Sequence, residues 1–186
     1  MRTGVFSFPW AFATGRALRE ELTRLASLGI DRLVLAVFYH DARQLLPRSG
    51  LGRLVWLDGG RSMVPVAAGR HPPGLAPRHA VVDLDARRVA EAARDAGLEP
   101  IAWTVTLHRD DLAHDPSVGL PRIVNAYGDV HRVTLCPSAP ETQAFFRAHL
   151  GDIASAGFAE VIAESAHFPP LPHGAAHEAL VAPLDD

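Results

Sequence analysis

The segment Glu160–Glu178, EVIAESAHFPPLPHGAAHE, holds the residues of this sequence that are best suited to chemistry. An apolar run ends on the carboxylate of Glu164, and His167 follows shortly after it. A second polar group comes after the prolines, at His173, His177 and Glu178. Carboxylates and imidazoles transfer protons near neutral pH and also ligate metals, so the segment suits either kind of site.

Glu164 ends a stretch that the apolar pattern predicts to be a buried strand. In one hypothesis, His and aromatic neighbours partly desolvate its carboxylate, which then serves as a general acid. In the other, Glu164 is a strand-end residue that pairs with an arginine. The spacing alone favours neither hypothesis.

The histidine cluster raises the question of a metal site. On a helix, His173 and His177 would share one face at spacing i, i+4. The prolines at 169, 170 and 172 disfavour a helix directly before the cluster, and the spacing matches neither HExxH nor HxxEH. We therefore expect His173, His177 and Glu178 to form a polar rim around a substrate, with no metal and no other cofactor.

Polar or aromatic side chains also follow the other apolar runs. They are Trp10 after the first run, Tyr39 and His40 after the second, and His108 after the third. Because the carboxyl ends of parallel strands lie at one edge of a sheet, we expect these side chains to surround one site with Glu164 and His167. Aromatic faces beside groups that bind hydroxyls suit a sugar-like ligand.

The remaining aromatic and imidazole side chains are expected to have no part in the site. Trp56 and Trp103 are predicted to pack against other side chains. His131, in a loop, and His149, on a helix face, are predicted to be solvated.

Strand and helix patterns alternate along the chain. Apolar runs at 3–9, 32–40, 100–107 and 160–164 predict parallel strands that neighbour one another in chain order. Stripes of apolar residues predict helices over 14–29, 83–97 and 138–157. The Asp58-Gly59-Gly60 turn predicts an inserted hairpin around 53–67.

Two architectures fit this order of elements, both as a single α/β domain over 1–186. The first is the N-terminal half of a (β/α)8 barrel, with four βα units, since a whole barrel takes about 250 residues. The alternative is an open four-stranded parallel sheet. In a half-barrel, the first and fourth strands have open edges, so we expect either a second half in the same gene or a second copy as partner.

Composition excludes several classes of function. The net charge of −3 gives no reason to expect nucleic acid as partner, and no apolar run is long enough to span a membrane. The single cysteine, Cys136, forms no disulfide within the chain. We expect a cytoplasmic protein whose partner is a carbohydrate-type small molecule.

Several segments carry a resemblance to a known family. LCPSAPETQAFFRAHLGDIASAGFAEVIAESAHFP and DRLVLAVFYHDARQLLPRS resemble the glycosyl-hydrolase-like TIM-barrel proteins. The similarity is closest to an uncharacterised bacterial subgroup with NAFGD, LCP and HGxHHEK segments, which are NAYGD, LCPS and HGAAHEA in this sequence.

The resemblance implies a (β/α)8 barrel with a carbohydrate-type site at its upper face. It places Glu164 at the fourth strand as the catalytic carboxylate. It adds the segments around Tyr39, His40, Asn125 and Tyr127 to those that approach the site. The sequence departs from the subgroup at two positions, with Ala176 in place of His and Ala179 in place of Lys.

Three functions remain open at this point. The first is a glycoside hydrolase-like enzyme, which needs a second carboxylate; Asp41 is the nearest candidate among these units, and the missing strands are the more natural source. The second is a non-catalytic carbohydrate-binding barrel. The third is a metal-dependent lyase or isomerase that uses His173, His177 and Glu178.

Overall fold

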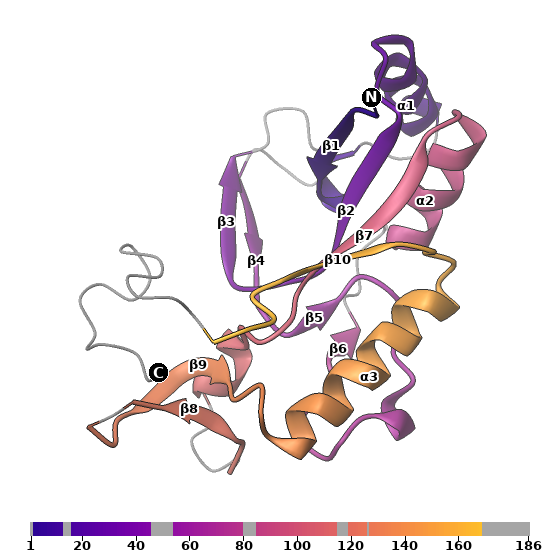
Figure 1. Ribbon diagram of the computed structural model, residues 1–186. Coiled ribbons are helices and arrows are strands. Elements are labelled where there is room, and N and C mark those ends of the chain that lie inside the picture. Colours follow the sequence, from indigo (N-terminus) through magenta and orange to yellow (C-terminus); the bar gives the residue numbers. More distant parts are fainter. Residues whose placement is uncertain are drawn as a thin grey trace.

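The computed structural model describes residues 2–12, 16–45, 54–79, 85–114, 119–125 and 127–168. Figure 1 shows the arrangement of the helices and strands. The strands are β1 (Gly4–Ser7), β2 (Arg32–Tyr39), β3 (Ala42–Leu45), β4 (Leu54–Leu57), β5 (Arg61–Ser62), β6 (Arg78–His79), β7 (Glu99–Val105), β8 (Arg122–Val124), β9 (Val130–Leu135) and β10 (Val161–Glu164). The helices are α1 (Arg16–Ser27), α2 (Ala86–Asp95) and α3 (Pro140–Ser155), with 3-10 turns η1 (Pro9–Ala11), η2 (Ala68–Arg70) and η3 (Asp110–His114). No helix in these ranges is long and apolar enough to cross a membrane.

The central sheet contains four parallel strands in chain order, β1-β2-β7-β10. Gly4 pairs with Arg32, Arg32 pairs with Glu99, and Val161 pairs with Ala102. This confirms the predicted order of the four apolar runs. A doubly wound sheet would instead reverse its order at a switch point. The carboxyl ends of all four strands consequently lie at one edge.

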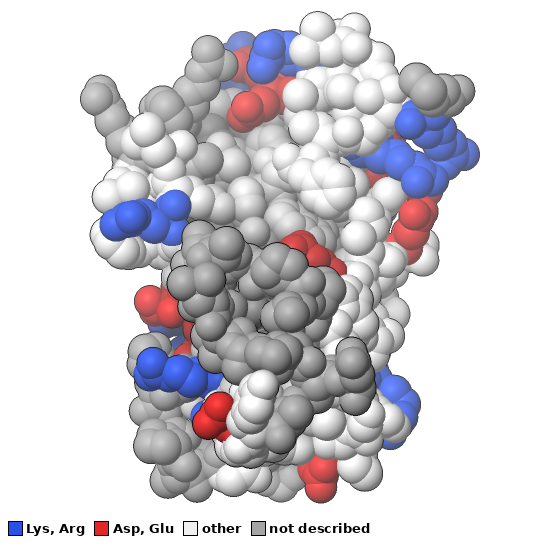
Figure 2. Space-filling model, turned by 60° about the vertical axis from the view of Figure 1, so that its left-hand side comes forward, with Lys and Arg blue, Asp and Glu red and all other residues white. Residues whose placement is uncertain are grey.

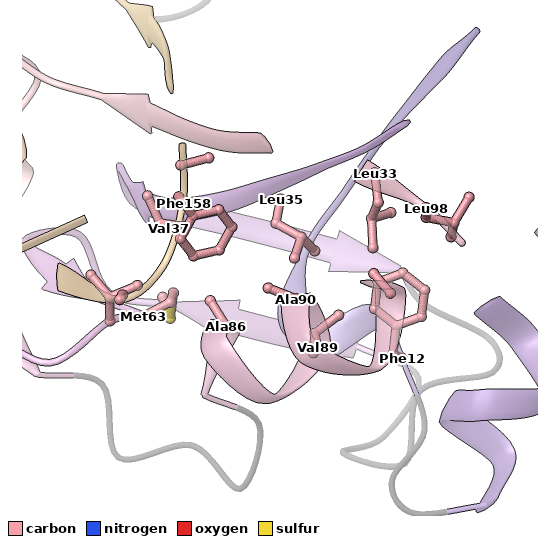
Figure 3. Packing of buried hydrophobic residues seen from close by; sticks show 14 of the residues in the cluster. Phe12, Leu33, Leu35, Val37, Met63, Ala86, Val89, Ala90, Leu98 and Phe158 are labelled. Carbon is pink, nitrogen blue, oxygen red and sulfur yellow. The ribbon is translucent and has the colours of Figure 1, made fainter. Parts of the chain in front are cut away.

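One face of this sheet is covered by helices. Leu33, Leu35 and Val37 alternate along β2 and pack against Val89 and Ala90 of α2 (Figure 3). Burying each such Leu or Val side chain contributes about 1.5–3 kcal/mol. The continuous apolar run of β2 is explained by burial on both faces, because Val34 and Ala36 are also buried.

The opposite face of the sheet is partly open to solvent. Phe6 is 57% exposed there and packs edge-on against Trp103. At the amino ends of the strands, the Arg32 guanidinium bridges Glu99 at 3.0 Å and Glu160 at 3.4 Å. In a closed barrel, this face would line the interior.

The inserted hairpin differs from the prediction around 53–67. β4 pairs antiparallel with β3, before it in the chain, whereas β5 pairs antiparallel with the end of β2 and parallel with β6. The turn Asp58-Gly59-Gly60 therefore links two sheets and does not close a hairpin.

Close packing explains the two glycines in that turn. The Gly59 N–H donates to the Asp41 carboxylate. Gly60 has a φ of +71° and lies so close to the Asp111 carboxylate that a Cβ would overlap it. The sequence signal for a tight turn was correct, but its cause is contact with Asp41 and Asp111 and not hairpin closure.

A second, smaller core lies beyond the carboxyl ends of β2 and β7. Phe38, Leu107, Leu135 and Phe145 are buried in it. β9 pairs antiparallel with β8 and continues alongside the residues that follow β7, since Leu135 N–H donates to the Leu107 carbonyl. This packing fixes the loop that carries His108 and Asp110.

Candidate functional site

Glu164 lies at the carboxyl end of β10, on the face of the sheet opposite to the helices. Trp103 Nε1 donates a hydrogen bond to its Oε2 at 2.6 Å. The strand register explains the contact, because Ile162 pairs with Trp103 and Glu164 follows two residues later on the same face. The Glu164 side chain is exposed. Its carboxylate is oriented by the Trp103 indole, whereas the sequence suggested either a partly desolvated carboxylate or an arginine partner.

Tyr39 lies between Glu164 and the histidines His40 and His108. Its ring lies 5.0 Å from Trp103 and 4.1 Å from His40, centroid to centroid. Burial raises the pKa of the Tyr39 hydroxyl, and the negative charge of Glu164 raises it further. Tyr39 therefore stays protonated at neutral pH and is able to donate a hydrogen bond to a ligand.

The backbone directly after Glu164 is strained. Ser165 has a φ of +52°, and it is the one non-glycine residue in the described ranges with positive φ. Such conformations cost about 1–3 kcal/mol and cluster at functional sites. The turn redirects the chain immediately beyond the Glu164 carboxylate.

His40 and His108 form the second part of the site. Their rings stack at 5.1 Å. His108 Nε2 donates to Asp110 Oδ1 at 3.0 Å, and the Asp41 backbone N–H donates to Asp110 Oδ2 at 2.6 Å. The loops after β2 and β7 are thereby joined, as expected for strand ends that share one edge.

Asp110 is held as a carboxylate by these contacts. Burial raises the pKa of its carboxyl, but the hydrogen bonds from His108 and the Asp41 N–H, with the charges of His108 and His40, outweigh burial and lower it. Asp110 therefore orients His108, much as a carboxylate orients the imidazole of a catalytic pair. Asp41 and Asp110 both accept hydrogen bonds from backbone N–H groups, whereas the Glu164 carboxylate accepts one from the Trp103 indole.

Trp10 does not belong to the surface of the site. It is 2% exposed, lies in the main core, and donates through Nε1 to Gln44 Oε1 at 2.9 Å. The 3-10 turn η1 bends the chain directly after β1 and points the indole inward. The expectation that Trp10 contacts a ligand is corrected by this burial.

Asn125 and Tyr127 lie at the turn between β8 and β9. Asn125 Oδ1 accepts hydrogen bonds from the backbone N–H groups of Tyr127 and Asp129, so this side chain stabilises the turn. Tyr127 is exposed at the same turn. The structure thus gives Asn125 a structural role where the resemblance implied ligand contact.

The remaining predicted residues lie beyond β10. His167 is exposed, and its Nδ1 donates to the Phe168 carbonyl at 2.6 Å. His173, His177 and Glu178 lie outside the described residues. Within the described ranges, no group of three or more His, Cys, Asp or Glu side chains could hold a metal ion.

Sequence reasoning missed two residues of this site. Trp103 was assigned to packing, although it lies two residues before the end of β7, on the face that Glu164 also uses. Asp110 follows His108 at spacing i, i+2, a signal for a local His–carboxylate pair that could have been used.

Comparisons with known proteins concern the fold. No protein-family model matches the sequence, and a search of curated proteins finds no match. Among solved structures, the chain is similar to a hypothetical protein from Ruminiclostridium thermocellum ATCC 27405, with a TM-score of 0.57 and 14% identity over 89% of this chain and 77% of that one.

Two enzymes of known structure are also similar. The noncanonic maltogenic alpha-amylase AmyB from Thermotoga neapolitana matches with a TM-score of 0.51 and 14% identity, over 91% of this chain and 40% of that one. The trehalulose synthase MutB from Pseudomonas mesoacidophila MX-45 matches with a TM-score of 0.50 and 13% identity, over 88% of this chain and 34% of that one. The chain thus has a mixed α/β fold with a parallel sheet that matches part of a TIM-barrel glycosidase, and it spans well under half of either enzyme.

Proposed function

We propose that this protein binds and hydrolyses a glycoside at the carboxyl ends of its parallel strands. The observation that carries the proposal is the position of Glu164, which accepts a hydrogen bond from Trp103 beside the protonated Tyr39. Aromatic faces, a phenol donor and an exposed carboxylate together suit a sugar. The similarity to parts of an amylase and of a trehalulose synthase supports the fold on which such a site would be built.

The residues have separate roles in this proposal. Glu164 exchanges a proton with the glycosidic oxygen, and Trp103 and Tyr39 keep its carboxylate oriented. His40 and His108 contact the hydroxyl groups of the sugar, and Asp110 fixes the orientation of His108. Glycoside hydrolysis ordinarily requires two carboxylates that flank the bond. We propose that the second one comes from strands that complete the barrel.

On this proposal, Glu164→Gln lowers kcat/KM for a hydrolysed chromogenic glycoside at least about hundredfold, because general acid–base catalysis contributes 10²–10⁴-fold. The measurement is a screen of nitrophenyl glycosides followed by kinetics on the best substrate. Glu160→Gln is the matched control, since Glu160 precedes the same strand at the opposite end of the sheet and bridges Arg32 there. Equal activity of both variants would remove Glu164 from the mechanism.

A non-catalytic carbohydrate-binding protein is the second candidate. The exposed carboxylate and the aromatic cluster would bind sugar equally well without a second carboxylate. Figure 2 shows acidic and basic side chains of the described residues interspersed among uncharged ones on the face that it views. Binding of a sugar without turnover, unchanged in Glu164→Gln, would favour this second function.

We further propose that the four parallel strands form half of a (β/α)8 barrel. Among the described strands, β1 is hydrogen-bonded only to β2, and β10 only to β7, so both edges are open. The exposed Phe6 lies on the face that a closed barrel would bury. The missing strands come from a second half in the same gene or from a second copy.

Residues 1–186 expressed alone should therefore associate, and the associated form should carry the glycosidase activity. Analytical ultracentrifugation across a range of concentrations tests this expectation. Phe6→Glu should shift the protein toward monomer, because it places a charge on the face that is to be covered. Leu28→Glu, at an exposed leucine after α1, should leave the sedimentation unchanged. A stable and fully active monomer would contradict the half-barrel proposal.

A further inference from the structure

A surface groove next to the loop that follows β2 is lined by an exposed tryptophan. It has a volume of about 320 Å³ and is lined by Asp41, Ala42, Arg43, Trp56, Leu57 and Asp58, here called the hairpin groove. Trp56 is 67% exposed, although sequence reasoning assigned it to packing. Tryptophan is highly buried on average in folded proteins, so an exposed indole beside a groove points to a ligand.

The strand pairing explains why Trp56 faces outward. Val55 and Leu57 turn toward the main core, and alternation along β4 sends Trp56 to the other face. Arg43 is its direct partner on β3, and the guanidinium lies 5.3 Å from the centre of the Trp56 ring. The arginine restrains the indole as an outward-facing platform.

The polar groups of the groove are held in place by residues outside it. Asp58 Oδ2 accepts a hydrogen bond from Arg61 at 2.8 Å, and the Asp41 carboxylate accepts one from the Gly59 N–H. A carboxylate offers several acceptor positions, so each can also accept from a hydroxyl group. An aromatic platform flanked by two carboxylates and a guanidinium matches a sugar ring, which has an apolar face and hydroxyls at its edge.

Asp41 connects this groove to the site around Glu164. Asp41 lines the groove, while its backbone N–H donates to Asp110 and its carbonyl accepts from His40 Nδ1 at 2.7 Å. A ligand in the groove would thus lie against the loop that carries His40.

We propose that the hairpin groove is a subsite for a second sugar unit, so that the ligand of this protein is an oligosaccharide and not a monosaccharide. The proposal rests on the proposed function, because the first unit occupies the site around Glu164. Trp56 packs against the apolar face of the second unit, and Asp41, Asp58 and Arg43 bind its hydroxyls.

Calorimetric titration with malto-, cello- and chito-oligosaccharides of two to six units tests the subsite. Affinity of the unsubstituted protein should rise with chain length in one series. Trp56→Ala should weaken binding of the longer members about tenfold, which corresponds to about 1.4 kcal/mol. Leu45→Ala is the matched control, since Leu45 is exposed on the same face of the hairpin but does not line the groove.

The outcomes separate the subsite from the proposed function. If Trp56→Ala binds every length as the unsubstituted protein does, the subsite is overturned and the proposed function stands. If Leu45→Ala weakens binding as much as Trp56→Ala, the whole apolar face of the hairpin is responsible and the groove assignment is overturned. If no oligosaccharide binds to the unsubstituted protein, the proposed function fails and the subsite fails with it.

Discussion

Lowering the pH from 7 to 4 should cost the protein about 3 kcal/mol of unfolding free energy through His149 alone. His149 is a residue of α3, is 0% exposed and is hydrogen-bonded to Thr104 Oγ1 at 2.8 Å. Burial lowers its pKa from 6.5 to about 3; the positive charges of His71 and Arg109 act in the same direction, and Asp152 opposes them. The buried imidazole is therefore neutral in the folded protein.

The sign of the pH effect follows from these two pKa values. Above pH 6.5, His149 is neutral in both the folded and the unfolded chain and contributes no pH dependence. Between pH 6.5 and about pH 3, His149 binds a proton in the unfolded chain but stays neutral in the folded protein. Stability is consequently lost by about 1.4 kcal/mol for each pH unit as the pH falls through this window.

Urea unfolding at pH 7, 5.5 and 4 measures this loss. His149→Gln keeps a hydrogen-bonding group beside Thr104 without a titrating imidazole, so its stability should fall less over the same window. His79→Gln, at an exposed histidine of β6, is the control and should fall as much as the unsubstituted protein. Parallel losses in His149→Gln and the unsubstituted protein would show that His149 is protonated when folded.

Arg109→Ala should destabilise the protein by about 3–5 kcal/mol, the range for breaking a buried ion pair. Arg109 is 1% exposed and donates through Nε and Nη2 to the two carboxylate oxygens of Asp111, each at 2.9 Å. Its Nη1 donates to the Leu75 carbonyl at 2.9 Å, and its guanidinium lies 5.1 Å from the Phe145 ring. Alanine would leave the Asp111 carboxylate and the Leu75 carbonyl without these donors.

A double substitution distinguishes the lost charge pair from lost packing. Arg109→Met with Asp111→Asn removes both charges and keeps much of the volume, so it should recover part of the loss. Arg16→Ala is the surface control, because its pair with Glu20 is exposed and contributes about 0.5 kcal/mol or less. Chemical denaturation gives all three values. A cost for Arg109→Ala as small as that for Arg16→Ala would refute the structural role of this pair.

The parallel strands could be predicted because their pattern is local. A continuous apolar run such as β2 is typical of a strand buried on both faces, and the runs at β1, β7 and β10 fell in the same order in space as in the chain. The hairpin was predicted at the wrong place. The Asp58-Gly59-Gly60 sequence indicates a backbone turn with a positive φ, but it does not indicate which strands pair with each other.

His149 shows what sequence patterns leave out. Its helix, α3, buries Thr142, Phe145, His149 and Asp152 on one face, so polar residues occupy positions where an apolar stripe is expected. The distant partners Thr104 and His71 explain why His149 and Asp152 can be buried. The prediction of a solvated His149 was wrong for that reason.

The residues of the candidate site that lie at the carboxyl ends of strands could be predicted from the sequence. Tyr39, His40, His108 and Glu164 follow from the rule that parallel strands share a carboxyl edge, and contacts link them. The exposure of Trp56 and the burial of Trp10 depend on how β4 and η1 pack, which no local pattern specifies.

The crystal structure of Glu164→Gln with a bound oligosaccharide tests the central claim most directly. The account predicts a glycosidic oxygen within hydrogen-bonding distance of residue 164, with a sugar ring against Trp103 or Tyr39. Sugar bound elsewhere on the molecule, with the side chain at 164 still bonded only to Trp103, would contradict the assignment of the site.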